Sequence, residues 1–407
     1  MPATLSPRRE RLLLLTLAGI QFCHIVDFMI VMPLGPILMR DFGLGAHEFA
    51  LLVASYSFTA AISGVLTAIF VDRFERTRLL LAPFALFTLA TLACGLAPNY
   101  PTLMLARGLA GAFGGLMGAL VQTMVADAIP YERRATATGF VSTAFSISTV
   151  LGVPLSLFVA NWLGWRAPFM FIATLSLGAI LIGMRVLPEL RHHLGGERRA
   201  HPFSAMLAVL GEANHLRTLL LSALIIFSGF TVIPYITVYA VGNVGISQHD
   251  IPIIYLVGGG ATLFTARLIG RLADAHGKVE VYRIVAVAAL VPLVLVTHIG
   301  AVPLWAWVAC TTAFFVLLSG RMVPAMAIIS SAARPQLRGT FMSLNGTVQS
   351  VAMGLATMLS GFIISVDAGG NIVGYPLVGY VAIAANLLAI VFISRIVVHE
   401  RAPTTGG

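Results

Sequence analysis

Twelve long apolar runs leave few folds open to this 407-residue chain. A helix needs about 20 consecutive apolar residues to cross the hydrocarbon core of a membrane, and most of the runs reach or exceed that length. The runs do not alternate in hydrophobicity, as the strands of a membrane β-barrel do. We therefore predict an all-α membrane protein with twelve spans, at residues 12–39, 49–71, 79–97, 101–129, 135–161, 167–187, 217–241, 251–272, 281–299, 303–330, 338–366 and 374–396.

The composition supports a membrane protein and excludes several soluble classes. Apolar residues make up 58% of the chain and charged residues only 10%, against about 25% charged in a typical globular protein. So few charges cannot cover the surface of a cytosolic enzyme, a disordered chain or a nucleic-acid-binding domain. The three cysteines, Cys23, Cys94 and Cys310, lie inside apolar runs, so no disulfide framework or metal site is indicated.

The basic residues predict the orientation of the chain in the membrane. Of the 25 Lys and Arg residues, 21 lie near the termini or in loops and span ends that follow even-numbered spans. Basic residues favour the cytoplasmic side, so we expect a multi-pass protein of the plasma (inner) membrane with both termini in the cytoplasm. The net charge of +9 then reflects orientation in the membrane and not a nucleic-acid patch. We expect the basic residues to contact anionic lipid head groups.

A polar stretch and an internal repeat divide the chain. Residues 188–216 form the only long polar segment between spans, which predicts an N-terminal six-helix bundle at 1–187, a cytoplasmic linker at 188–216, and a C-terminal six-helix bundle with a short tail at 217–407. An offset of 202 residues pairs Asp72 with Asp274 and Gly43 with Gly245 at matching places in the two halves. Many transporters are built from two such copies of one template.

At these loops the chain resembles the major facilitator superfamily, over essentially its full length. The segment GRLADAHGK at 270–278 is similar to the family signature Gly-x-x-x-Asp-x-x-Gly-Arg/Lys after the second span of a half, while the first-half copy has Ala68 and Glu75 in place of the usual glycines. Such charges can form a link that holds two bundles together in one state, or they can simply anchor the helix ends. The resemblance assigns gating roles to Asp72, Arg73, Arg76, Gly270, Arg271, Asp274, Gly277 and Lys278.

Two further motifs resemble those of proton-coupled members. Arg107, within Leu105–Gly108, resembles the arginine motif of the fourth helix. Gly152 and Pro154 resemble the fifth-helix antiporter motif of drug and sugar efflux members, although Val153 separates the two residues. The resemblance implies the twelve-helix drug/sugar proton-antiporter branch.

Ionisable residues inside the spans are the strongest functional signal, because each costs roughly 2.5–3.5 kcal/mol at a helix centre. Asp27 is the one acidic residue near the middle of a span, and His24 and Gln21 precede it on much the same helix face. We predict that Asp27, Arg107 and His24 carry proton coupling, with Arg107 modulating the proton affinity of Asp27. A permanent structural pair, or direct substrate binding without proton exchange, are the alternatives.

Other polar and aromatic residues within spans are candidates for a central substrate cavity. Arg321 either meets an anionic part of the substrate or is satisfied by backbone carbonyls, and the sequence favours neither. The candidate cavity residues are Gln21, Tyr56, Gln122, Tyr235, Tyr239, Arg321 and Asn345.

Together these features and the family resemblance predict a secondary transporter that exports a small amphipathic solute in exchange for protons by alternating access. A drug- or metabolite-like solute is what the resemblance implies. A proton symporter or facilitator for uptake is the nearest alternative, and a non-transporting receptor is a more distant one. The sequence shows no Walker-type phosphate loop, metal-ligand cluster or nucleophile–base set. We therefore expect no enzymatic activity, cofactor or metal, and a monomer whose partners are the solute, protons and lipid.

Overall fold

The protein is almost entirely helical in a computed structural model that describes residues 6–70, 74–188, 202–334, 336–367 and 369–398. Within these residues, twelve helical segments are long and apolar enough to cross a membrane. Each of the twelve predicted runs overlaps one of these segments, which confirms the predicted fold class.

Each half contains six spans, some of them broken into shorter helices. The N-terminal half consists of α1 (Pro7–Ile30), α2 (Gly35–Phe42), α3 (Ala46–Phe70), α4 (Arg76–Leu96), α5 (Tyr100–Ala128), α6 (Tyr131–Ile147), the π-helical η2 (Ser148–Gly152), α7 (Val153–Leu163) and α8 (Arg166–Val186). After α9 (Pro202–Leu210), the C-terminal half consists of α10 (Ala213–Phe230), η4 (Ile233–Tyr235), α11 (Ile236–Tyr239), η5 (Ala240–Val244), η6 (Gln248–Asp250), α12 (Ile251–His276), α13 (Lys278–Ala288), α14 (Leu290–His298), α15 (Leu304–Gly320), α16 (Met322–Ala332), α17 (Arg338–Ile363), β1 (Ser365–Val366), β2 (Ile372–Val373) and α18 (Tyr375–Ile393).

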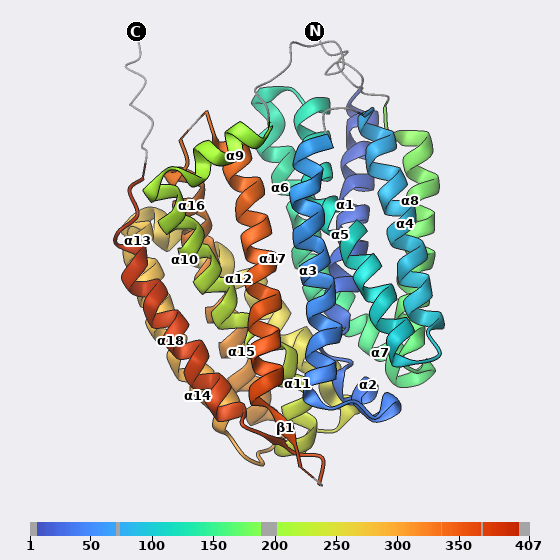
Figure 1. The fold of residues 1–407 in the computed structure, drawn as a ribbon, viewed down its shortest axis with the longest axis vertical. Helices are drawn as coiled ribbons and strands as arrows, with labels where there is room; N and C mark the ends of the chain where they lie inside the picture. Colours follow the sequence, from blue (N-terminus) through green and yellow to red (C-terminus); the bar gives the residue numbers. More distant parts are fainter. Residues whose placement is uncertain (1–5, 71–73, 189–201, 335, 368, 399–407) are drawn as a thin grey trace.

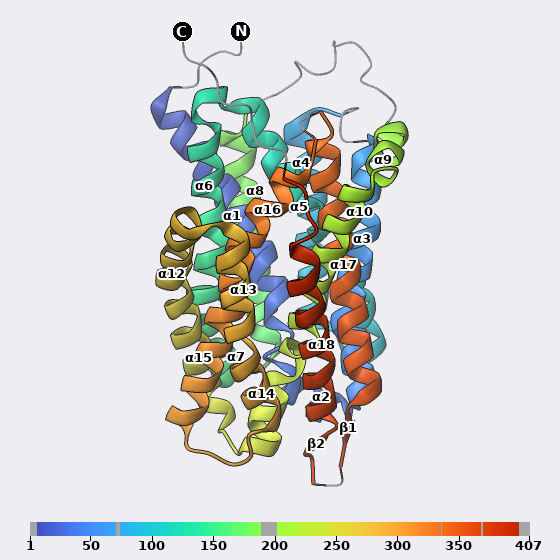
Figure 2. The ribbon, with the colours of Figure 1, turned by 90° about the vertical axis from the view of Figure 1, so that its left-hand side faces the viewer.

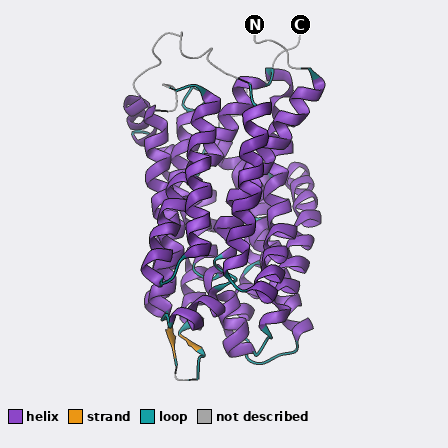
Figure 3. Cartoon of the chain, turned by 90° about the vertical axis from the view of Figure 1, so that its right-hand side faces the viewer, coloured by secondary structure: helices purple, strands orange, loops and turns teal. Residues whose placement is uncertain are grey.

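The helices run along the long axis of the molecule and define two ends (Figure 1). α9 lies at one end, where α1 begins and α18 finishes, and we call it the linker end. The antiparallel pair β1–β2, in which Ser365 faces Val373, marks the opposite end, which we call the hairpin end. In the described chain this hairpin is the only strand pair, as Figure 3 shows in orange.

The first span of each half breaks at a corresponding place. α1 stops at Ile30 and the chain resumes as α2, whereas α10 stops at Phe230 and resumes as η4. Gly43 caps α2 with φ 65°, and Gly245 caps η5 with φ 83°. Both glycines therefore adopt the left-handed conformation that disfavours other residues, so the sequence repeat at an offset of 202 corresponds to one structural template used twice.

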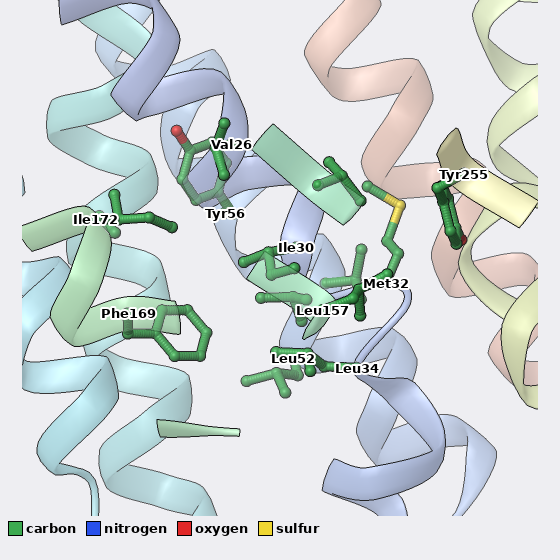
Figure 4. Close-up of a cluster of buried hydrophobic side chains, with 14 of the residues drawn as sticks. Val26, Ile30, Met32, Leu34, Leu52, Tyr56, Leu157, Phe169, Ile172 and Tyr255 are labelled. Carbon is green, nitrogen blue, oxygen red and sulfur yellow. The ribbon is translucent and has the colours of Figure 1, made fainter. Parts of the chain in front are cut away.

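The two halves are joined at the hairpin end. The hydroxyl of Tyr235 donates to the carbonyl of Ala46 at 2.6 Å, and Asn161 Nδ2 donates to the carbonyl of Gln248 at 3.4 Å. α3 packs along α17, as both side views show (Figures 1 and 2). One buried apolar cluster includes side chains of both halves, among them Met32 and Tyr255 (Figure 4).

The boundaries predicted for the two bundles and the linker stay predictions. α10 begins at Ala213, before the predicted start of the second bundle at residue 217, and α9 lies within the predicted linker. Residues 189–201 of that linker lie outside the described part of the chain.

Candidate functional site

Asp27 on α1 and Arg107 on α5 form a buried ion pair. Arg107 Nη1 donates to Asp27 Oδ2 at 2.8 Å and to the Asp27 backbone carbonyl at 3.1 Å. The two side chains are 0% and 1% exposed. Both residues are predicted from the sequence, but counting from the span ends places Asp27 nearer to the centre of the membrane than Arg107. Because α1 stops at Ile30, Asp27 lies one turn from the end of its helix and at the depth of Arg107.

An aromatic ring supports the cation of this pair. Arg107 Cζ lies 4.6 Å from the centre of the Tyr56 ring, on α3, an arrangement that stabilises a guanidinium through the ring quadrupole. Thr91, on α4, lies near the Asp27 carboxyl group, although its hydroxyl has no hydrogen-bond partner among the described residues. The sequence predicts Tyr56 only as a cavity residue, and no pattern in it distinguishes Thr91.

Glycines of α5 make room for Tyr56. A Cβ atom added at Gly111 would lie 2.3 Å from the Tyr56 carbonyl oxygen, and one added at Gly114 would lie 2.2 Å from the Tyr56 hydroxyl. Real Cβ contacts are not this short, so only glycine permits α3 and α5 to approach here, as small residues do between membrane helices. The glycine-rich stretch of α5 therefore positions the ring under Arg107.

This packing gives a testable expectation for Gly114→Ala. The added methyl group collides with the Tyr56 hydroxyl, and overpacking of this kind costs about 1–3 kcal/mol. Tyr56→Phe removes the hydroxyl and should restore the unfolding temperature of the purified Gly114→Ala protein. Gly118→Ala is the matched control, because its Cβ meets nothing within 4 Å. Equal destabilisation by both alanines, or no rescue by Tyr56→Phe, would show that this contact does not limit the packing.

The ion pair leaves hydrogen-bonding capacity unused. Asp27 Oδ1 and Arg107 Nε are both buried, and neither has a hydrogen-bond partner among the described residues. An arginine and a carboxylate can pair through two parallel bonds, but here the side chains share one. Buried polar atoms are nearly always satisfied in native proteins, so the second carboxylate oxygen is a suitable acceptor for a proton or a ligand.

His24 and Gln21 lie on the linker side of Asp27 along α1. Both His24 ring nitrogens and Gln21 Oε1 are buried without a hydrogen-bond partner in the described chain. The structure therefore brings Asp27 and Arg107 together, but it gives no hydrogen bond from His24 to Asp27 among these residues.

The antiporter-like motif packs against the helix that carries Asp27. Gly152 ends the π-helical turn η2, and Pro154 lies in the first turn of α7, where a missing N–H is tolerated. A Cβ at Gly152 would lie 2.4 Å from Val26 Cγ2. Gly152 thus allows the fifth span to contact α1 beside Asp27.

Arg321, at the junction of α15 and α16, has a different environment from Arg107. It is 1% exposed, and it donates to Ser228 Oγ at 3.3 Å, to the Ile225 carbonyl at 2.9 Å and to Asn386 Oδ1. None of its hydrogen bonds with described residues goes to a carboxylate. In the structure the partners of Arg321 are neutral groups, and one of them is a backbone carbonyl, as in the second of the two predicted environments.

The remaining cavity candidates occupy varied positions. Tyr235 joins the halves through Ala46, whereas Tyr239 is buried and donates to the Ile299 carbonyl at 3.0 Å. Gln122 is exposed, and Asn345 is buried with its Oδ1 lacking a partner in the described chain. Their role in a cavity stays a prediction.

The gating motif differs between the two halves. Asp72 and Arg73 lie outside the described residues, but Arg76 forms an ion pair of 2.7 Å with Asp127 at the end of α5. The Glu75 side chain caps α4, because it accepts hydrogen bonds from the backbone N–H groups of Thr77 at 2.9 Å and Arg78 at 2.7 Å. A helix cap thus replaces the usual glycine in the first-half copy.

In the second half the motif has its usual glycine. Gly277 adopts φ 94° between α12 and α13, a conformation that favours glycine. Gly270 is partly buried, whereas Arg271, Asp274 and Lys278 are exposed, and no ion pair between described residues includes them. The two copies therefore differ in their charge contacts, and their gating role stays a prediction.

Twelve spans in two related halves, with an ion pair buried near the broken first helix, define the architecture of a secondary transporter. The family model described as Major Facilitator Superfamily matches residues 17–357, and this chain belongs to that superfamily. Members of this superfamily are generally non-enzymatic carriers.

Two proteins of Bacillus subtilis (strain 168) are similar to part of the chain. The uncharacterized MFS-type transporter YcnB is 32% identical over 156 residues, which are 38% of this chain and 33% of YcnB. The uncharacterized MFS-type transporter YhcA is 31% identical over 171 residues, which are 42% of this chain and 32% of YhcA. The chain thus spans about a third of the length of these curated relatives.

Solved structures show the same fold over nearly the whole chain. A bacterial homologue of the human lysosomal transporter Spinster, in an inward-facing and occupied conformation, has a TM-score of 0.79 at 16% identity and covers 98% of this chain and 100% of its own. A D-xylose-proton symporter has a TM-score of 0.76 at 18% identity and covers 96% and 98%. At these identities the likeness establishes the fold alone.

Proposed function

We propose that this transporter exports a small amphipathic organic solute in exchange for protons, and that Asp27 carries the proton. The buried Asp27–Arg107 pair is the observation that supports the proposal most strongly. The C-terminal half has no acid at the corresponding position, because the repeat offset of 202 residues places Gly229 of α10 there.

The chemistry of the pair suits an exchange cycle. Ionised Asp27 holds Arg107 through one carboxylate oxygen and its backbone carbonyl, and its Oδ1 has no hydrogen bond from the described residues. A proton accepted by the carboxyl group removes the charge that attracts the guanidinium, so protonation weakens the pair. A solute that binds only one protonation state is then linked to the proton, because a ligand shifts an equilibrium by its differential affinity for the two states.

The surroundings of the pair indicate the class of solute. The neighbouring side chains include the aromatic Phe28 and Tyr56 and the aliphatic Val26. One carboxylate among apolar groups suits an amphipathic or cationic solute. We further propose that the protein acts as a monomer in the plasma membrane, with its linker end in the cytoplasm.

Proton exchange is tested in vesicles with a pH-sensitive dye in the lumen. A thermal-shift screen of amphipathic cations, such as ethidium and tetraphenylphosphonium, first selects a probe that stabilises the folded protein. When that probe is added to vesicles with an acidic lumen, the lumen should become less acidic as the probe accumulates. Proton entry together with the probe identifies a symporter instead, and probe entry without a pH change identifies a facilitator.

A further inference from the structure

Three aromatic rings connect the buried ion pair of one half to the other half. The guanidinium of Arg107 lies over Tyr56, and the centre of the Tyr56 ring lies 5.2 Å from that of Phe28 on α1. The ring of Phe28 in turn lies 6.2 Å from that of Phe230 on α10, with an angle of 41° between the ring planes. We call Tyr56, Phe28 and Phe230 the aromatic column.

The internal repeat gives the last contact a particular position. Phe28 and Phe230 are separated by the same offset of 202 residues that relates Gly43 to Gly245. They are therefore equivalent residues of the two halves, and they meet where the halves meet. Phe28 directly follows Asp27 in the sequence. The aromatic ring that contacts the other half is therefore next to the ionisable residue.

Phe230 also lies at a break in its own span. α10 stops at Phe230, and η4 follows after Thr231 and Val232. η4 ends at Tyr235, whose hydroxyl donates to the Ala46 carbonyl of the other half. A displacement of the Phe230 ring thus acts at the junction that leads to this contact between the halves.

We infer that the aromatic column transmits the protonation state of Asp27 to the relative orientation of the two halves, with Phe230 as a positioning residue. This inference rests on the proposed proton coupling. When Asp27 is ionised, it holds Arg107 against Tyr56, and the column is complete. When Asp27 is neutral, Arg107 loses its charged partner and its contact with the Tyr56 ring weakens. Tyr56 and Phe28 can then move, and the contact between Phe28 and Phe230 is lost.

The groups around Asp27 leave it as the site that changes charge. The titratable side chains close to it are Arg107, Cys23, Tyr56 and Cys94, on α1, α3, α4 and α5, and His24 lies one turn earlier on α1. None of them is a second carboxylate, and His24 makes no hydrogen bond to Asp27 among the described residues. Aromatic pairs of this geometry shift an equilibrium by roughly two- to tenfold, which is a moderate bias on the two orientations.

Two measurements on the full-length protein test the inference. The first is the number of protons bound between pH 5 and pH 9, taken as the difference from Asp27→Asn. The second is the distance between spin labels on Trp162→Cys and Trp305→Cys in a Cys310→Ser background, since these tryptophans belong to different halves and are 78% and 74% exposed. The first reports the proton on Asp27, and the second reports the orientation of the halves.

Phe230→Ala should still bind the Asp27 proton, but the equilibrium constant between the two label-distance populations should change with pH by a factor that is roughly two- to tenfold smaller. Phe230→Leu keeps an apolar side chain without a ring, so it should show the same loss and decides the question if the alanine variant does not fold. Phe227→Ala, one turn earlier on the same helix and also partly exposed, is the matched control and should respond like the wild type.

A wild-type response in Phe230→Leu or Phe230→Ala overturns the role of the column and leaves the proposed proton coupling intact. A wild-type protein whose label distances do not depend on pH, or a response that persists in Asp27→Asn, overturns the proposed coupling itself. Equal losses in Phe230→Ala and Phe227→Ala would show a general effect of helix packing, which also contradicts the inference.

Discussion

Asp27→Asn is expected to abolish accumulation driven by a proton gradient and to leave downhill exchange of the same solute measurable. A gradient of one pH unit supplies about 1.4 kcal/mol per proton, which supports about a tenfold solute gradient. Asparagine has nearly the shape of the carboxyl group and can still accept the hydrogen bond from Arg107 Nη1, but it cannot release a proton. The accumulation ratio in vesicles should therefore fall from about ten to about one.

The matched control for this experiment is Asp41→Asn. Asp41 lies on α2, beyond the first span, and also pairs with an arginine, Arg40 at 3.3 Å, but its side chain is 38% exposed. The same substitution there removes an exposed charge and should leave the accumulation ratio unchanged. Undiminished accumulation by Asp27→Asn, with proton counterflow retained, would remove Asp27 from the mechanism.

The sequence predicts the spans well because membrane insertion leaves a direct mark on it. A helix in lipid must be apolar on most of its surface and long enough to cross, so each span is visible as a run of residues. The repeat is visible for a similar reason, since Gly43 and Gly245 are needed where the chain turns with positive φ. These features depend on local requirements and not on which helices become neighbours.

The contacts of the site depend on packing, which the sequence does not reveal. Run 12–39 is continuous in hydropathy, yet it contains the break after Ile30 that brings Asp27 to the depth of Arg107. The partners of Arg321, Ser228 and Asn386, lie on apolar helices where no periodicity distinguishes them. The signal that could have identified Phe28 and Phe230 is the repeat offset itself, applied to aromatic residues as well as to loop motifs.

Glu75 illustrates a departure from a family pattern that the structure explains. The sequence shows only that a glycine of the usual motif is missing. The structure shows that Glu75 has φ −61° and caps α4 with its side chain. A carboxylate at a helix N-terminus also interacts favourably with the helix dipole, so this loop uses a cap where the second half uses the positive φ of Gly277.

Arg107→Met should cause the largest loss of stability among the single substitutions considered. Methionine replaces much of the apolar length of arginine, but it leaves the Asp27 carboxylate buried without a cation. Removing one partner of a buried ion pair costs about 3–5 kcal/mol, because the remaining charge is uncompensated. Unfolding of the purified protein in detergent, followed by temperature or denaturant, measures this loss.

A double-mutant cycle separates the lost pair from a general packing defect. In the wild-type background, Asp27→Asn is expected to destabilise, because Arg107 loses its charged partner. In the Arg107→Met background, the same substitution should stabilise, because it removes the unpaired carboxylate. Arg321→Met provides the control: since Arg321 bonds to neutral groups among the described residues, Asp27→Asn should act there as it does in the wild type. Additive effects of Asp27→Asn and Arg107→Met would mean that the two charges do not stabilise each other, despite their separation of 2.8 Å.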